Sequence, residues 1–170
     1  MNKQKKWQIG LGVVGALVII GALSGGSKHN NSNSGSNNAP DSTLVTPTTA
    51  DQSGAWASWK SNFSPAWSSF TNDFQTLQND TSLGDVTTVS NDFVTLSNDA
   101  VALDGYADSP SGQLNSDLAQ FNSDVAQLAY DGNSYLLGNT DLSVYQSDLS
   151  TVTSDINTLV GDVNAGNNQY

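Results

Sequence analysis

The chain of 170 residues contains no cysteine, no glutamate and no arginine, and it has a single histidine. The lack of cysteine excludes disulfides, thiolate metal sites and cysteine nucleophiles. The lack of arginine removes the usual bidentate clamp for phosphate and carboxylate ligands. The one histidine, His29, lies in a polar stretch where a catalytic base would have no structured partner. We therefore expect a protein that is not an enzyme and needs no cofactor.

Basic residues are also scarce, and they are unevenly distributed. Four of the five lysines lie within residues 1–28, so residues 29–170 hold one lysine against 16 aspartates, a net charge of −15. A surface this negative repels the phosphates of nucleic acids. The composition therefore argues against a nucleic-acid partner.

The N-terminus carries a basic lead followed by an apolar run. Lys3, Lys5 and Lys6 precede residues 7–24, which as a helix would be about 27 Å long, close to the thickness of a bilayer core. The lysines predict that the N-terminus stays inside and that the rest of the chain lies outside. We favour an uncleaved single-pass anchor, because the run reaches the length of a span. The alternative is a signal peptide cleaved after Ser24, which would release the protein.

Four regions follow from the changes in composition along the chain. Residues 1–24 form the anchor or signal peptide, and residues 25–48, rich in Asn, Ser and Gly, predict a disordered tether. Residues 49–166 predict a helical domain, and residues 167–170 a disordered tail. The first 50 residues or so resemble in composition the start of small bacterial surface proteins.

Within the predicted domain, aspartate recurs every seven residues, one place ahead of an apolar residue. The last stretch shows the pattern most fully, with Asp141, Asp148, Asp155 and Asp162 seven apart. The apolar residues of that stretch are spaced alternately three and four apart: Leu142, Tyr145, Leu149, Val152, Ile156, Leu159 and Val163. This is a heptad seam with apolar a and d positions and aspartate at g. Aspartate occupies the same g position in three earlier stretches, at Asp73, Asp80, Asp92, Asp99, Asp117, Asp124 and Asp131.

Four such stretches with short connections predict an all-α fold, an up-down-up-down four-helix bundle with coiled-coil-like seams. The first helix should begin near Thr49, and Pro65 should kink it or divide it, with Ser64 capping the second part. The second helix should run from about residue 83 to residue 103, with Gly105 in the left-handed conformation behind it.

The last two helices are bounded by turn signals. Asp108 and Pro110 should open the third helix, which should end at Gly132 or Gly138. Thr140 should cap the fourth helix, which should end near residues 165–166.

The aspartate register has a structural and a functional interpretation. Aspartates at g positions border the core, so they can simply be solvated flanks that discourage wrong helix pairing. In an antiparallel bundle, g positions of neighbouring helices can face each other, and carboxylates are the ligands that Ca²⁺ and Mg²⁺ prefer. The candidate cation ligands are Asp117, Asp124, Asp148 and Asp155. Close aspartates also raise each other's pKa, so we expect the domain to gain stability as the pH falls.

The first half of the first helix departs from the aspartate pattern. It carries three of the four tryptophans and Lys60, the only lysine of the predicted domain. Trp56 and Trp67 fit core positions, whereas Trp59 stands where aspartate is expected at g. The candidate binding residues are therefore Trp56, Trp59, Lys60 and Trp67, as an aromatic platform for a protein or glycan partner.

Taken together, these patterns predict a membrane-tethered extracytoplasmic helical bundle with a non-catalytic binding, spacer or structural role at the cell envelope. The membrane contact would be made by residues 7–24. The alternative is a module that binds or senses divalent cations through its aspartate ladders. A third alternative, an aspartate-dependent hydrolase, would need a cleft in which two carboxylates converge. The oligomeric state is not predicted.

Overall fold

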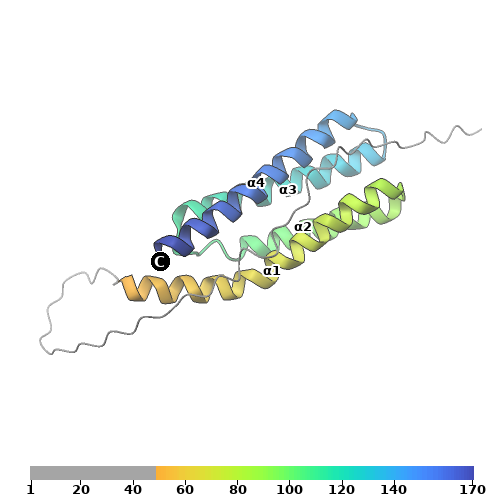
Figure 1. Cartoon of the computed structure of the whole chain (residues 1–170). Helices are drawn as coiled ribbons and strands as arrows, with labels where there is room; N and C mark the ends of the chain where they lie inside the picture. The colour runs from red at the N-terminus through yellow and green to blue at the C-terminus, as the bar shows by residue number, and fades with distance from the viewer. Residues whose placement is uncertain (1–48) are drawn as a thin grey trace, which may run out of the picture.

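The computed structural model describes residues 49–170, which form an all-α domain of four helices (Figure 1). The helices are α1 (Thr49–Leu83), α2 (Val86–Asp104), α3 (Gly112–Leu136) and α4 (Leu142–Gln169), and each packs against the next along the chain. This confirms the predicted all-α domain of four helices. The predicted anchor or signal segment and the tether lie outside the described residues. None of the helices within residues 49–170 is both long and apolar enough to cross a membrane.

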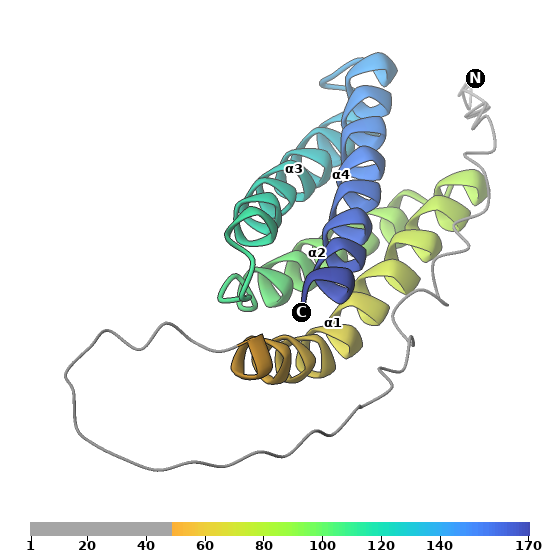
Figure 2. The same cartoon turned by 60° about the vertical axis from the view of Figure 1, so that its left-hand side comes forward.

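Successive helices run in opposite directions, so the described chain starts and finishes at the same end of the domain. The Trp56 indole near the start of α1 donates a hydrogen bond to Asn167 Oδ1 on α4 (3.1 Å), and the Tyr170 hydroxyl donates one to the Pro110 carbonyl (3.3 Å). We call this the termini end; it also holds the α2–α3 connection (Figure 2). The opposite end, which we call the hairpin end, holds the α1–α2 and α3–α4 connections.

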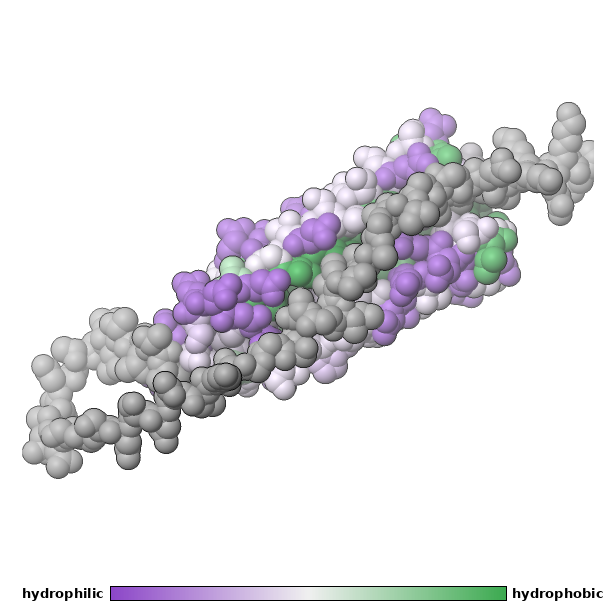
Figure 3. Space-filling model, viewed as in Figure 1, coloured by the Kyte–Doolittle hydropathy of each residue, from purple (hydrophilic) through white to green (hydrophobic). Residues whose placement is uncertain are grey.

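The core is built from the seam residues of all four helices, as the heptad spacing predicts. The seam of α1 is mostly aromatic, and its rings stack in sequence with centroids 4.6–6.1 Å apart. The α1 and α4 backbones approach each other less closely than successive helices do. Rings of α1 reach the other helix pair, with Trp56 against Gly166 of α4 and Phe70 against Phe121 of α3. Apolar surface is visible between the two helix pairs in Figure 3.

Helix α1 is continuous across Pro65, so of the two predicted outcomes, a kink or a division of the helix, the division does not occur. Ser64 does not cap a second helix, because its hydroxyl donates to the Lys60 carbonyl one turn earlier (2.7 Å). Pro65 has no N–H to pair with the Ser61 carbonyl, and its ring crowds the preceding turn. The ribbon of α1 changes direction between its orange and yellow parts, as expected for a proline bend (Figures 1 and 2).

The start of α2 is set by a side-chain cap rather than by the apolar pattern. Asp85 Oδ1 accepts from the backbone N–H groups of Thr87 (3.0 Å) and Thr88 (3.3 Å), so the helix begins at Val86 and not at residue 83. The left-handed glycine of this hairpin is Gly84 (φ 78°). The prediction that Gly105 is left-handed is wrong, since its φ is −60°.

Helix α3 begins later than predicted. Ser111 is its N-cap and accepts from the Leu114 N–H (3.3 Å), so Asp108 and Pro110 belong to the preceding connection. The helix continues through Gly132 and ends at Leu136, before the left-handed Gly138 (φ 77°).

Helix α4 follows Asp141 rather than Thr140 and continues to Gln169. The predicted disordered tail at residues 167–170 is therefore wrong. The ring of Tyr170 packs against Trp56 with centroids 5.5 Å apart, which holds the last turn of α4 on α1.

Candidate functional site

Ten aspartates at g positions form five carboxyl pairs between neighbouring helices. The two carboxyl groups of each pair lie within hydrogen-bonding reach of each other. The α1–α2 pairs are Asp73–Asp99 and Asp80–Asp92, and the α3–α4 pairs are Asp117–Asp162, Asp124–Asp155 and Asp131–Asp148. We call the first set the α1–α2 seam and the second set the α3–α4 seam.

The heptad pattern and the hairpin connections together explain this pairing. Two adjacent antiparallel helices place g opposite g, and a seven-residue repeat on both keeps the next pair in register about 10 Å further along. The α2–α3 interface has a different chemistry: the Ser90 hydroxyl donates to Asn133 Oδ1 there (2.7 Å). The described carboxyl pairs thus belong to the interfaces within the two hairpins.

Burial and the opposing carboxyl raise the pKa of one member of each pair. Desolvation is the larger cause, and the partner carboxyl adds to it, taking the pKa from an ordinary 3.8 to about 6 at Asp99, Asp148, Asp155 and Asp162. Asp92 is shifted in the same direction by desolvation and by Asp80. The same five residues each have a buried Oδ2 atom without a hydrogen-bond partner. Each of these oxygens is therefore a place where a proton or a cation would be stabilised.

Three glutamines distinguish the two members of each pair in the α3–α4 seam. Gln113 Nε2 donates to both carboxyl oxygens of Asp117 (3.0 and 2.9 Å), and Gln120 Nε2 donates to Asp124 Oδ2 (2.9 Å). The third bond of this kind joins Gln127 to Asp131. An amide N–H stabilises the ionised form of the carboxyl that accepts it. The α3 member of each pair thus has a hydrogen-bond donor on its own helix, whereas the buried Oδ2 atom of its α4 partner has none.

These glutamines and most of the pairing partners are not among the residues predicted from the sequence. The signal for the glutamines is visible in the chain, because a glutamine stands four residues before each α3 aspartate. Residues four apart are neighbours on one helix face, so the spacing predicts such a bond.

The structure brings together only some of the predicted cation ligands. Asp124 and Asp155 face each other, whereas Asp117 is paired with Asp162 and Asp148 with Asp131. Residues 49–170 contain no group of three or more side chains arranged to hold a metal ion. A Ca²⁺ ion between two carboxylates would need water for most of its six to eight oxygen ligands.

The tryptophan-rich part of α1 is core and not an exposed platform. Trp59 is 7% exposed and stacks between Trp56 and Phe63, with centroids 5.1 and 4.6 Å away. Its indole N–H donates to the Tyr106 carbonyl (2.8 Å), in the connection that follows α2. Tryptophan replaces aspartate at this g position because the opposing helix has already ended there.

The two other predicted binding residues of this region are held by the same packing. Trp67 is buried, and Lys60 is half-buried with its ammonium group donating to Asn167 Oδ1 (2.9 Å). With Trp56 and Trp59 also buried, none of the three indoles offers an open face to a ligand.

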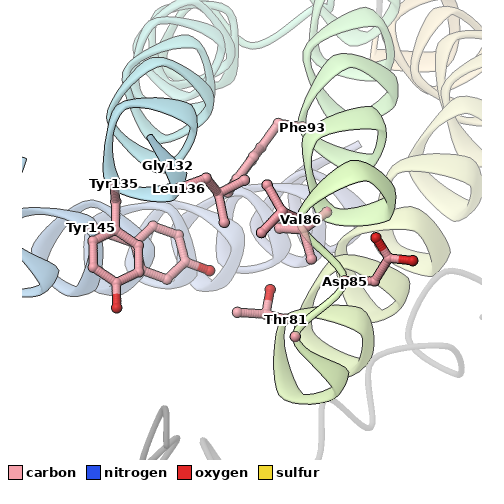
Figure 4. A pocket seen from close by; sticks show the side chains of 10 residues that line it. Thr81, Asp85, Val86, Phe93, Gly132, Tyr135, Leu136 and Tyr145 are labelled. Carbon is pink, nitrogen blue, oxygen red and sulfur yellow. The ribbon is translucent and has the colours of Figure 1, made fainter. Parts of the chain in front are cut away.

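A small apolar pocket lies at the hairpin end, between the α1–α2 connection and the α3–α4 hairpin (Figure 4). Val86 of α2 and Leu136 of α3 face each other across it, and the stacked rings of Tyr135 and Tyr145 lie to one side of them. Burial raises the pKa of the Tyr145 hydroxyl, whose neighbour is the Thr81 hydroxyl. Apart from Thr81, Asp85 and the two tyrosines the lining is apolar or glycine, so the pocket offers space for a small apolar group.

No family model, no curated protein and no solved structure matches the chain. A function for the described domain therefore has to be inferred from its own geometry. The burial of the apolar core does not require the aspartate pairs, so these pairs are the feature that calls for a functional explanation.

Proposed function

We propose that the chain is a membrane-tethered extracytoplasmic protein whose domain is a non-catalytic spacer or structural module of the cell envelope. The domain is then an up-down-up-down bundle with heptad seams, behind an anchor at residues 7–24 and a flexible tether at residues 25–48. The observation that carries this proposal is the continuous core, a single cluster of buried apolar side chains to which all four helices contribute. Such a bundle is self-supporting and elongated, which suits a spacer.

The position of the tether sets the orientation of the domain relative to the membrane. The described chain begins with α1 at the termini end, and 35 helical residues extend about 52 Å from there. The hairpin end would therefore lie furthest from the membrane. Leu83 and Leu137, which are 78% and 74% exposed at that end, would be the first apolar side chains that a protein partner meets.

Because the chain has no cysteine, a single introduced thiol reports its location without background. We expect Ser150→Cys, on an exposed position of α4, to react with a membrane-impermeant maleimide on intact cells. The matched variant Gln4→Cys, in the basic lead, should react only after lysis. Labelling of Ser150→Cys only after lysis would overturn the proposal. Recovery of the Ser150→Cys product in the medium, shortened by about 24 residues, would replace the anchor by a cleaved signal peptide.

A second candidate function is a module that depends on divalent cations. The observation that favours it is the row of buried Oδ2 atoms that lack a partner and face a second carboxyl. At neutral pH, millimolar CaCl₂ should then raise the melting temperature more than NaCl of equal ionic strength does, and a chelator should reverse the rise. Equal effects of the two salts would exclude cation binding and leave general screening of a negative domain.

A further inference from the structure

Each aspartate pair places two like charges against each other in a partly buried interface. Two ionised carboxylates in contact repel, and the repulsion is strongest where water is excluded. One proton converts the pair into a carboxylic acid that donates to a carboxylate, which is a short, charge-assisted hydrogen bond. The α2 or α4 member of each pair has a buried Oδ2 atom without a hydrogen-bond partner, and a shared proton reduces this deficit of donors.

No basic group within residues 49–170 neutralises either seam. The α1–α2 seam contains only Asp73 and Asp80 facing Asp92 and Asp99. The α3–α4 seam contains only Asp117, Asp124 and Asp131 facing Asp148, Asp155 and Asp162. The only lysine of the domain, Lys60, donates to Asn167 at the termini end. No side chain of the domain therefore supplies a positive charge to these carboxyl groups, and a bound proton is the simplest way to reduce the repulsion between them.

The pairs of one seam also act on each other. Asp148 experiences the charge of Asp124 in addition to that of its own partner Asp131, and Asp155 experiences Asp117 in addition to Asp124. A proton bound at one pair weakens the repulsion at its neighbours. Protonation along a seam is therefore a coupled event that involves a whole hairpin.

We propose that the two seams form an acid-responsive device: their aspartate pairs each take up one shared proton as the pH falls, which tightens the α1–α2 and α3–α4 hairpins, and release it as the pH rises. This property does not depend on where the protein resides, so it can fail or hold independently of the membrane-tethered role. It goes beyond a passive spacer, since the stiffness of the domain would follow the acidity of its surroundings.

The sign of the effect follows from proton linkage. The pKa of the α4 aspartates and of Asp99 is raised in the folded domain to about 6, from an ordinary 3.8. The folded domain then binds more protons than the unfolded chain between these values, so its stability falls as the pH rises. The stabilisation is complete below about pH 4 and is lost as the pH rises through about 6.

The test is a thermal melt of the full chain in a non-ionic detergent with chelator present, followed by the near-ultraviolet circular dichroism of the buried tryptophans. We expect the melting temperature to be about 5 °C or more higher at about pH 5 than at about pH 7.5. A melting temperature that is equal at the two values, or lower at about pH 5, would overturn the proposal.

A pair of matched variants separates the seams from general charge. In Asp99→Asn/Asp155→Asn, an amide N–H takes the place of the shared proton in one pair of each seam. This variant should melt higher than the parent at about pH 7.5. Its melting temperature should differ less between the two pH values than that of the parent, because two of the five pairs no longer share a proton.

The control Asp108→Asn/Asp141→Asn removes the same charge at exposed positions that belong to neither seam. Its melting temperature should retain the full pH difference of the parent. If the control flattens the pH dependence as much as the seam variant does, net charge and not pairing is the cause, and the proposal fails.

Discussion

At the scale of single residues, two glycines determine how closely the helices can pack. Gly132 lies in α3 against the ring of Phe93, and Gly166 lies in α4 against the indole of Trp56. A methyl group at either position would overlap the ring. Gly132 was predicted as one of two helix ends because glycine often follows a helix. It lies instead inside α3, because only a residue without a side chain leaves room for the phenyl ring.

Gly166→Ala should lower the free energy of unfolding by about 1–3 kcal/mol, since the added methyl forces Trp56 out of its place against α4. The matched control is Gly161→Ala, one and a half turns earlier in α4. That position is exposed with open space around it, so alanine should stabilise the helix by about 0.5–1 kcal/mol. Urea unfolding of both variants measures the contrast. If both substitutions changed the free energy of unfolding in the same direction, the close packing of Trp56 on Gly166 would be contradicted.

At the scale of elements, the α2–α3 connection is held by a side chain from the next helix. Asn115 Oδ1 accepts from the Ser109 N–H (2.9 Å), and its Nδ2 donates to the Ser109 carbonyl (3.1 Å). The Ser109 hydroxyl donates to the Ser111 carbonyl (2.9 Å), and Ser111 then caps α3. The sequence places helix-start signals at residues 108–110, but this network delays the start by two to four residues.

Asn115→Ala should cost about 1–2 kcal/mol of stability, because it leaves the Ser109 backbone groups without their partner in a half-buried turn. Asn122→Ala is the control, since Asn122 occupies the same heptad position one repeat later and makes no side-chain hydrogen bond in the structure. We expect Asn122→Ala to change stability by less than about 0.5 kcal/mol. The denaturant midpoints of the two variants should be measured side by side. Equal destabilisation would contradict the role of Asn115 in holding the α2–α3 connection.

At the scale of the whole molecule, the negative charge is concentrated between helices. Ten of the 16 aspartates of the chain belong to the two seams, all of them half-buried. A charge run on a helix is usually a solvated face, and here the run is instead an interface. The net charge of the domain should therefore depend on its fold, since closing the hairpins is what brings the carboxyls together.

Much of the helical pattern could be read from local spacing. Apolar residues three and four apart predict the helices, their buried faces and the g phase of the aspartates, because a helix repeats every 3.6 residues whatever its neighbours are. The sequence also indicated that facing g positions could bring aspartates together. Helix ends were less accurate, since a cap such as Asp85 or a left-handed residue such as Gly84 competes with similar signals nearby.

What the sequence by itself determined is therefore the number of helices, the composition of the core and the heptad position of the aspartates. Only the tertiary structure decided that Asp117 pairs with Asp162 rather than with Asp148, and that Trp59 is buried under the α2–α3 connection. These outcomes depend on the register of one helix against another. That register is set by the length of each connection and by the positions at which a large ring such as Trp56 packs against a glycine of the facing helix. Contacts between residues far apart in the chain carry no period that a local pattern can show.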